Sequence, residues 1–452
     1  MSNRLLFGAS VKVLLLLALG AQFAVGGRAQ LVPSKLSLAK ATELLMQRNP
    51  TVLAAQRNLD ALRAQRTAAG LRPTPTLTAS ATQLALPRVF THPGLIFGTG
   101  DNVAANSTYT VEVDQLIERG DKRALRIAQA EWNVRLAEAQ LRDAVRQQLF
   151  QLRQSFFNAV LARENSRVAR ENLAHFDRMA QVLRAQYREG YAAGVDLRRI
   201  EIQRFELERD AVAAEQTYQQ AVRDVFNLIG AGDAPSGADV RLIGGRAGGE
   251  AEADLNAIEG DLDIIPVLLW IDDLRRLALA NRPDVQAARF NVEAARVGVQ
   301  LAIASKARDV TVGGQYARTG SDNTFGVVLS VPLKVGARAR TAIEQATALE
   351  LQAEAQLRQA ETQALTDVEK AFIAYRTSRD RLRAFTSDVL VAAEQVRRTE
   401  EAAYREGARG LIDFLDAQRA YNQLRVEYNQ ARYDLLMSLY QLEYATGARL
   451  LN

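Results

Sequence analysis

Two aspartates, Asp413 and Asp416, lie three residues apart at the start of an expected helix near the C-terminus. At the N-cap and N3 positions, carboxylates accept hydrogen bonds from free backbone N–H groups and interact favourably with the helix dipole. Capping is one interpretation of this pair. The other is a ring: if three copies surround one axis, six carboxylates raise each other's proton affinity and attract cations. Such a ring is a device for selectivity and gating.

An earlier turn of the chain provides a comparison. Asp196 occupies the equivalent position there, but Arg199 and not an acid follows three residues later. The two turns therefore differ where a purely structural cap requires no difference. Arg409 lies inside the second turn, where packing has little use for a guanidinium, and this favours an ion pair or hydrogen bond between helices. Tyr404 fits both a packed aromatic and a gating residue, whereas Tyr187 fits packing better.

The sequence offers no catalytic or metal-binding constellation. Its two histidines, His92 and His175, lie in different expected elements without acids at metal-ligand spacing. The lack of cysteine excludes disulfides, thiolate metal sites and an acylated cysteine. The net charge of +5 comes from basic residues interspersed with acids, which is typical of solvated helix faces and not of nucleic-acid binding. We expect no enzyme, no cofactor, no metal and no nucleic-acid partner.

Residues 1–29 have the organisation of a secretory signal peptide. Two basic residues precede or enter the apolar run 13–19, and small residues flank a cleavage position at 27–29. The apolar run is too short to cross a bilayer, which argues against a membrane anchor. We expect an exported chain whose mature form begins near Gln30.

An internal repeat is the most informative feature of the chain. The sequence AEAQLR at 137–142 returns unchanged 216 residues later, and YREG ends at Gly190 and again at Gly407. These matches divide the chain into a first repeat at 30–245 and a second at 246–452.

Glycine and proline, which helix interiors tolerate least, outline long helices in both repeats. Neither residue occurs in 121–189 or in 337–406. Apolar residues in the first stretch fall at steps of three and four, which predicts an amphipathic helix or coiled coil. At 1.5 Å per residue, each stretch predicts a rod roughly 100 Å long. Return helices at 196–229 and 413–446 must then fold back antiparallel.

Before each rod the period of apolar residues changes to two, which predicts two hairpins. Their strands are expected at about 76–87 and 106–118, and at about 309–317 and 324–333. Such strands suit either a soluble sheet packed on the helices or a membrane-spanning barrel. Four strands cannot close a barrel, and an open edge in lipid leaves backbone groups unpaired. A membrane barrel must therefore be shared, and three copies give twelve strands.

This plan of helix, hairpin, long helix, turn and return helix, together with the residues at the turns, resembles the TolC-type outer-membrane efflux family. The resemblance covers essentially the whole mature chain. Its most specific part is YREGARGLIDFLDAQ at 404–418, which matches the family's tip pattern of Tyr, Gly, Arg, Asp and Asp. The segment AGLRPTP at 69–75 looks more like the heavy-metal (cobalt-zinc-cadmium) efflux branch, although this chain lacks the acylated cysteine of some members of that branch.

The resemblance implies a mainly α fold with a membrane β-barrel: a trimeric, 12-stranded outer-membrane β-barrel continued by a 12-helix periplasmic α-barrel, with two structural repeats per protomer. It implies that Tyr404, Arg409 and Asp196 hold the periplasmic tip closed, while Asp413 and Asp416 narrow the pore. The turns at Gly190 and Gly407 then dock a periplasmic adaptor (membrane fusion) protein. This adaptor couples the homotrimer to an inner-membrane RND or ABC pump.

We therefore expect the outer-membrane channel of a tripartite efflux or type I secretion system. It is a passive exit duct in outer-membrane lipid that extends into the periplasm and is gated at its tip. Metal ions, drugs and a secreted protein are alternative cargoes. The main alternative function is a periplasmic helical-hairpin adaptor or scaffold without a pore, and a secreted coiled-coil protein is a third.

Overall fold

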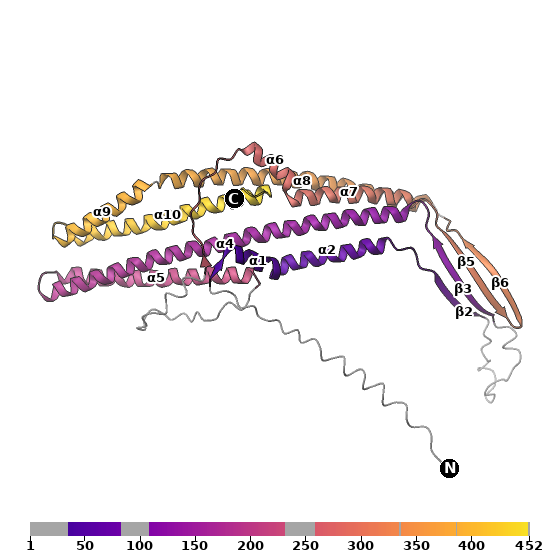
Figure 1. Ribbon diagram of the computed structural model, residues 1–452, viewed down its shortest axis with the longest axis horizontal. Coiled ribbons are helices and arrows are strands. Elements are labelled where there is room, and N and C mark those ends of the chain that lie inside the picture. Colours follow the sequence, from indigo (N-terminus) through magenta and orange to yellow (C-terminus); the bar gives the residue numbers. More distant parts are fainter. Residues whose placement is uncertain (1–34, 83–107, 231–257, 334–335, 386, 451–452) are drawn as a thin grey trace, which may run out of the picture.

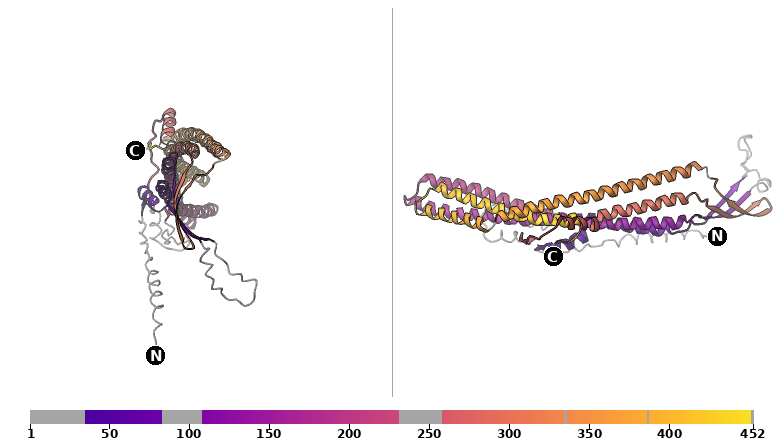
Figure 2. Two further views of the ribbon diagram at one scale, coloured as in Figure 1. Left: turned by 90° about the vertical axis from the view of Figure 1, so that its right-hand side faces the viewer. Right: turned by 90° about the horizontal axis from the view of Figure 1, so that it is seen from above.

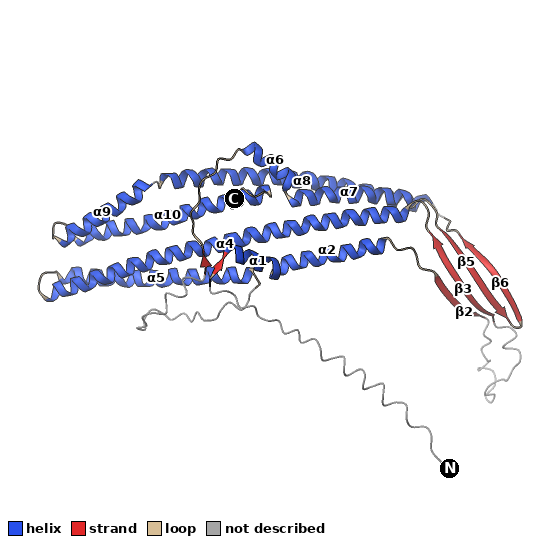
Figure 3. Cartoon of the chain, in the orientation of Figure 1, coloured by secondary structure: helices blue, strands red, loops and turns tan. Residues whose placement is uncertain are grey.

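A computed structural model describes residues 35–82, 108–230, 258–333, 336–385 and 387–450. Long helices run side by side in an elongated layer that ends in a small sheet (Figure 1). At the opposite end of the layer, one tight turn connects α4 to α5 and another connects α9 to α10 (Figure 3). The expected signal peptide at 1–29 lies outside the described residues.

The first repeat contains two short helices, two strands, one very long helix and a return helix. These are α1 (Leu38–Arg48), α2 (Pro50–Ala69), β2 (Thr76–Thr82), β3 (Thr108–Ile117), α4 (Lys122–Arg188) and α5 (Gly194–Leu228). Helix α4 has 67 residues, in the stretch free of glycine and proline. Residues 83–87 of the first expected strand lie outside the described residues.

The second repeat follows the same order. Its elements are α6 (Ile271–Asn281), α7 (Pro283–Ala304), β5 (Val310–Thr319), β6 (Asp322–Ser330), α8 (Gly336–Ala384), α9 (Ser387–Arg405) and α10 (Leu411–Thr446). Two short strands, β1 (Leu36–Ser37) and β4 (Ile258–Glu259), form a separate parallel pair.

The single rod expected over 337–406 is wrong in one respect, because it is divided into α8 and α9. The chain leaves α8 in a tight turn in which the N–H of Phe385 donates to the carbonyl of Leu382 (3.1 Å). The sequence Thr-Ser-Asp follows at 386–388, and these residue types favour helix N-termini over helix interiors. Asp388 indeed lies in the first turn of α9. The prediction of one continuous helix rested on the lack of glycine and proline in 337–406. It missed the break because neither residue occurs there.

The two repeats begin α2 and α7 with a proline but support it differently. Asn49 caps α2 by accepting from the N–H of Thr51 (2.9 Å), and its amide also donates to Gln148 (3.0 Å). The equivalent Arg282 is buried before α7 and donates to Asp284 (2.6 Å) and Asp367 (2.8 Å). The position before the proline therefore makes neutral hydrogen bonds in the first repeat and ion pairs in the second.

The sheet combines both hairpins in the antiparallel order β2-β3-β5-β6. Its register places Leu77, Val113 and Val327 on one face, with Gly314 between the last two. The adjacent residues Thr78, Glu112 and Gln315 lie on the other face, as the alternation predicts. Leu77 is 69% and Val327 76% exposed, so helices do not cover the apolar face. The soluble sheet packed on helices is therefore wrong.

Apolar packing along the layer is concentrated in three clusters. Two lie near its middle, where α1 packs on α4 and α5, and where α6 packs on α8 and α10. The third lies at the turns. Figure 2 shows that the helical layer is curved when it is viewed from its end. Among the described residues, no helix combines the length and the hydropathy needed to span a bilayer.

Candidate functional site at the helical tip

Two equivalent glycine turns close the end of the layer remote from the sheet. Gly190 has φ +83° and Gly407 has φ +73°, a region that favours glycine. After each, a backbone N–H reaches back to the preceding helix: Tyr191 to Gln186 (2.8 Å) and Ala408 to Ala403 (2.9 Å). This is the Schellman arrangement of helix C-termini. No atom lies within 4 Å of where a Cβ would stand at either glycine, so the backbone alone requires it.

A small core behind these turns joins both repeats. Phe176 and Leu183 of α4 and Ile200 of α5 pack there with Leu411 and Phe414 of α10. All five are buried. At the tip, α4 with α5 forms one helical hairpin and α9 with α10 forms the other. These two helical hairpins, called the hairpins below, are therefore held together at the tip by apolar contact.

Tyr404 belongs to the edge of this core. Its ring stacks on Phe414, with centroids 6.2 Å apart and planes 19° apart. Burial raises the pKa of Tyr404 above its ordinary value, and the Asp196 carboxylate raises it further. Tyr404 is therefore a packed aromatic that also feels the charge of the first-repeat aspartate.

The aspartates do not occupy the cap positions that the sequence predicts. Helix α10 begins at Leu411, so Asp413 is at N3, where its carboxylate accepts from the N–H of Gly410 (3.3 Å). Asp416 lies a turn further on, 68% exposed and 3.8 Å from Arg419. The helix begins early because Leu411 packs into the tip core. Capping therefore explains Asp413 but not Asp416.

The first-repeat Asp196 is also at N3, because α5 begins at Gly194. Its nearest cation is Arg199, at 3.9 Å. Arg409 is exposed in the turn, and its guanidinium contacts no acceptor within the described part of this protomer. Of the predicted gate residues, the Asp196 carboxylate thus acts on Tyr404 electrostatically, while Arg409 contacts neither of them within the described part of the protomer.

Several contacts between the hairpins involve residues that the sequence did not single out. Arg419 of α10 donates to Gln203 of α5, which links the two return helices. The adjacent Gln418 donates to Asn172 (3.1 Å), and Arg425, further along α10, donates to Glu171 (2.8 Å), both on α4. The spacing of Asp416 and Arg419 on one helix face was the only signal available, because contacts between repeats need the packed structure.

His175 also lies between the hairpins. Its Nε2 is 3.9 Å from Glu401 of α9, and its ring centroid is 6.1 Å from that of Phe414. Burial lowers the pKa of His175; Glu401 opposes the lowering, whereas Arg397, Arg178 and Arg405 add to it. His92 lies outside the described residues, which contain no group of three or more acids and histidines able to hold a metal.

The family profile of the outer membrane efflux protein matches residues 41–231 and 274–448, most of both repeats. The chain belongs to this family. It is accordingly an outer-membrane efflux protein that extends into the periplasm, and it is not the poreless periplasmic adaptor that the sequence left open. The family is one of transport proteins.

Curated relatives of this outer membrane efflux protein include secretion and resistance proteins. The alkaline protease secretion protein AprF of Pseudomonas aeruginosa is 25% identical over 69% of this chain and 64% of its own length. The outer membrane protein TolC of Vibrio cholerae is 29% identical over 36% of this chain and 40% of its own. The chain thus spans less than two thirds of these two relatives. The cobalt-zinc-cadmium resistance protein CzcC of Cupriavidus metallidurans is 25% identical over 75% of this chain and 77% of its own.

Solved structures confirm the predicted fold. The outer membrane protein VceC of Vibrio cholerae superposes with a TM-score of 0.68 at 18% identity, over 91% of this chain and 96% of that one. A crystal structure of CusC gives 0.69 at 16% identity, over 91% and 92%. The fold of this efflux protein is therefore that of the TolC-type channels.

Proposed function

We propose that three copies of this chain form a passive exit duct: a shared twelve-stranded β-barrel in the outer membrane, continued by a twelve-helix tunnel in the periplasm. The observation that carries the proposal is the sheet. It exposes an apolar face, and within the described residues its outer strands β2 and β6 each have one strand neighbour. Unpaired backbone groups in lipid cost several kcal/mol each. Pairing β6 of one copy with β2 of the next removes both edges.

The helical layer supports the same assembly. In its tip half the helices lie in the order α9-α10-α4-α5, so α9 and α5 form the edges. Helix α5 exposes Ile202 and Phe205, and α9 exposes Val389 and Val396, seven residues apart. A spacing of seven is typical of a helix seam. A neighbouring copy that brings its α9 against α5 buries both sets.

We place the gate at the tip. Asp196, Tyr404 and Arg409 hold it closed, and Asp413 and Asp416 from three copies surround the axis. The exposed Arg409, which has no acceptor within its own described protomer, is available to a neighbouring copy. In the closed state the carboxylates attract cations to the entrance.

The partners follow from the same reading. A periplasmic adaptor docks around Gly190 and Gly407, and an inner-membrane RND or ABC pump supplies the driving force, because a passive duct does not couple transport to an energy source. Relatives at the same 25% identity are named for protease secretion and for cobalt, zinc and cadmium resistance. Protein and metal-ion cargoes therefore remain alternatives, beside drugs, and the segment 69–75 favours the metal branch.

The contact between Gln203 and Arg419 provides a test of the gate. The chain has no native cysteine, so Gln203→Cys with Arg419→Cys introduces one specific disulfide between the return helices. Export through the oxidised double variant should stop and recover after reduction with dithiothreitol, while either single variant should export normally. We infer that the gate opens by movement of the return helices α5 and α10, and full export by completely cross-linked protein would contradict this.

A further inference from the structure

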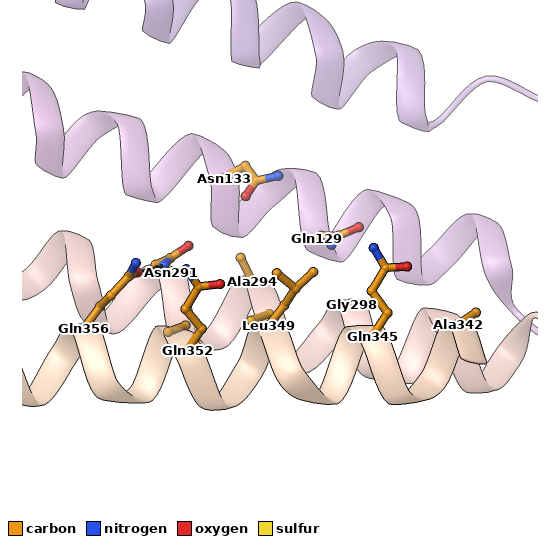
Figure 4. Close-up of a pocket in the computed structure, with 13 residues that line it drawn as sticks. Gln129, Asn133, Asn291, Ala294, Gly298, Ala342, Gln345, Leu349, Gln352 and Gln356 are labelled. Carbon is orange, nitrogen blue, oxygen red and sulfur yellow. Dashed lines mark hydrogen bonds between the residues drawn. The ribbon is translucent and has the colours of Figure 1, made fainter. Parts of the chain in front are cut away.

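A groove lined by amides lies between three helices in the sheet-proximal half of the layer. It has a volume of about 460 Å³ and is formed by α4, α7 and α8. Figure 4 shows side chains of α4 and α8 pointing toward one another across α7. None of its lining residues is charged. Besides the amides, the lining residues are alanines, one glycine and one leucine. The amides are Gln129, Asn133, Asn291, Gln345, Gln352 and Gln356.

The groove lies on the inner side of the curved layer. Helix α7 lies between α4 and α8 and packs against both. Side chains from the two flanking helices converge over one face of α7 and leave a hollow there, as on a concave face of the layer. In the assembled duct, the concave side faces the axis.

The opposite side of α7 has a different chemistry. At 100° per residue, Asn291 and Gly298 lie roughly opposite Arg296 on the helix. Arg296 pairs with Glu350 (3.4 Å) and Glu354 (3.5 Å) of α8. Ion pairs therefore hold one side of the α7–α8 seam, while amides and small residues line the other.

We propose that this groove is part of the wall of the transport path, an uncharged stretch whose amides hydrogen-bond to polar groups of passing cargo. The inference rests on the proposed duct. An amide both donates and accepts hydrogen bonds and carries no charge, so the stretch accepts polar cargo of either sign. Selection by charge is then left to the aspartates at the tip.

Cysteine substitution in this cysteine-free chain tests the proposal. Gln345→Cys places a thiol in the groove, and Glu354→Cys places one nine residues along the same helix, on the other side. Each purified variant is reconstituted in planar bilayers and treated with an anionic or a cationic methanethiosulfonate, with complete modification verified by mass spectrometry. For Gln345→Cys, the anionic adduct should increase cation preference and the cationic adduct should reduce it, as measured by reversal potential in a salt gradient. For Glu354→Cys, the reversal potential should not change.

The outcomes separate the two proposals. Wild-type trimers that never conduct would contradict the duct itself. Wild-type trimers that conduct, with a reversal potential unchanged by full modification at Gln345→Cys, would overturn the assignment of the groove to the path. A shift at Glu354→Cys instead would place the lumen on the ion-paired side.

Discussion

Single side chains at the tip serve both packing and charge. The ring of Tyr404 stacks on Phe414, and its environment is also influenced by the Asp196 carboxylate. Asp413 completes the start of α10, whereas Asp416 has no structural task beyond a long contact to Arg419. Because Asp416 contributes little to the structure, we expect its carboxylate to act mainly in attracting cations to the entrance.

Asp416→Asn should reduce the preference of the channel for cations with little effect on folding. Its side chain is exposed and its nearest cation is 3.8 Å away, so the carboxylate contributes little to stability. Three copies remove three negative charges from the entrance. Reversal potentials in a salt gradient measure the change, with the exposed Asp210→Asn, far from the turns, as control. An equal shift in both variants would show that Asp416 has no special place on the path.

The pKa of His175 leads to a pH dependence of the contact between hairpins. Burial holds its folded-state pKa below the ordinary 6.5, so the unfolded state binds more protons between these two values. The stability contributed by neutral His175 is present above about pH 6.5 and is lost as the pH falls through the folded-state pKa. Amide hydrogen exchange in α9, corrected for intrinsic rates, should therefore become faster on acidification. His175→Gln should abolish this dependence, and an unchanged dependence would refute it.

For the residues of the site, the sequence could indicate which residue types lie at each tip turn, but not which of these side chains contact one another. The stacking of Tyr404 on Phe414 depends on the packing of α9 against α10, and the Gln203–Arg419 contact joins residues 216 positions apart. The cap positions were misplaced by one turn, because the start of α10 is fixed by the burial of Leu411 and not by the first available acid.

At the scale of elements, the absence of glycine and proline predicted where the long helices run, because those residues break helices for local reasons. The positions of the strands could be predicted from the alternation of apolar and polar residues, which is also a local feature of the sequence. The break between α8 and α9 has no glycine or proline and only the weaker mark of Thr-Ser-Asp at 386–388, and Phe385 packs near Tyr428 of α10 (6.4 Å). Only a local cause can be read from local sequence.

Two glycines with the same backbone should respond differently to alanine. Gly407 and Gly447 have φ +73° and +67°, so alanine costs about 1–2 kcal/mol at both. At Gly447 a Cβ would also stand 3.1 Å from the carbonyl of Asn281, whereas at Gly407 it meets nothing. In detergent, Gly447→Ala should therefore lower the apparent unfolding temperature more than Gly407→Ala at the same heating rate. Equal losses would show that backbone strain alone decides both.

At the scale of the whole molecule, the protomer is an incomplete object. Among the described residues, its sheet has two open edges and an uncovered apolar face, and its helical layer exposes apolar residues on both edge helices. Each feature is unfavourable in isolation, and the proposed threefold closure would remove all of them. The sequence indicated the need for closure, because four strands cannot form a barrel, but the order of the helices across the layer came only from the structure.

Conductance of purified trimers in planar bilayers tests the gated duct most directly, with wild type compared against Arg409→Ser. Arg398→Ser, an exposed arginine of α9 paired with Glu394, is the matched control. We expect small wild-type steps that grow in Arg409→Ser and stay unchanged in Arg398→Ser, because Arg409, unlike the paired Arg398, has no acceptor within the described part of its own protomer. No conductance in any variant from well-folded trimers would contradict the duct, and large wild-type steps that Arg409→Ser leaves unchanged would contradict the gate.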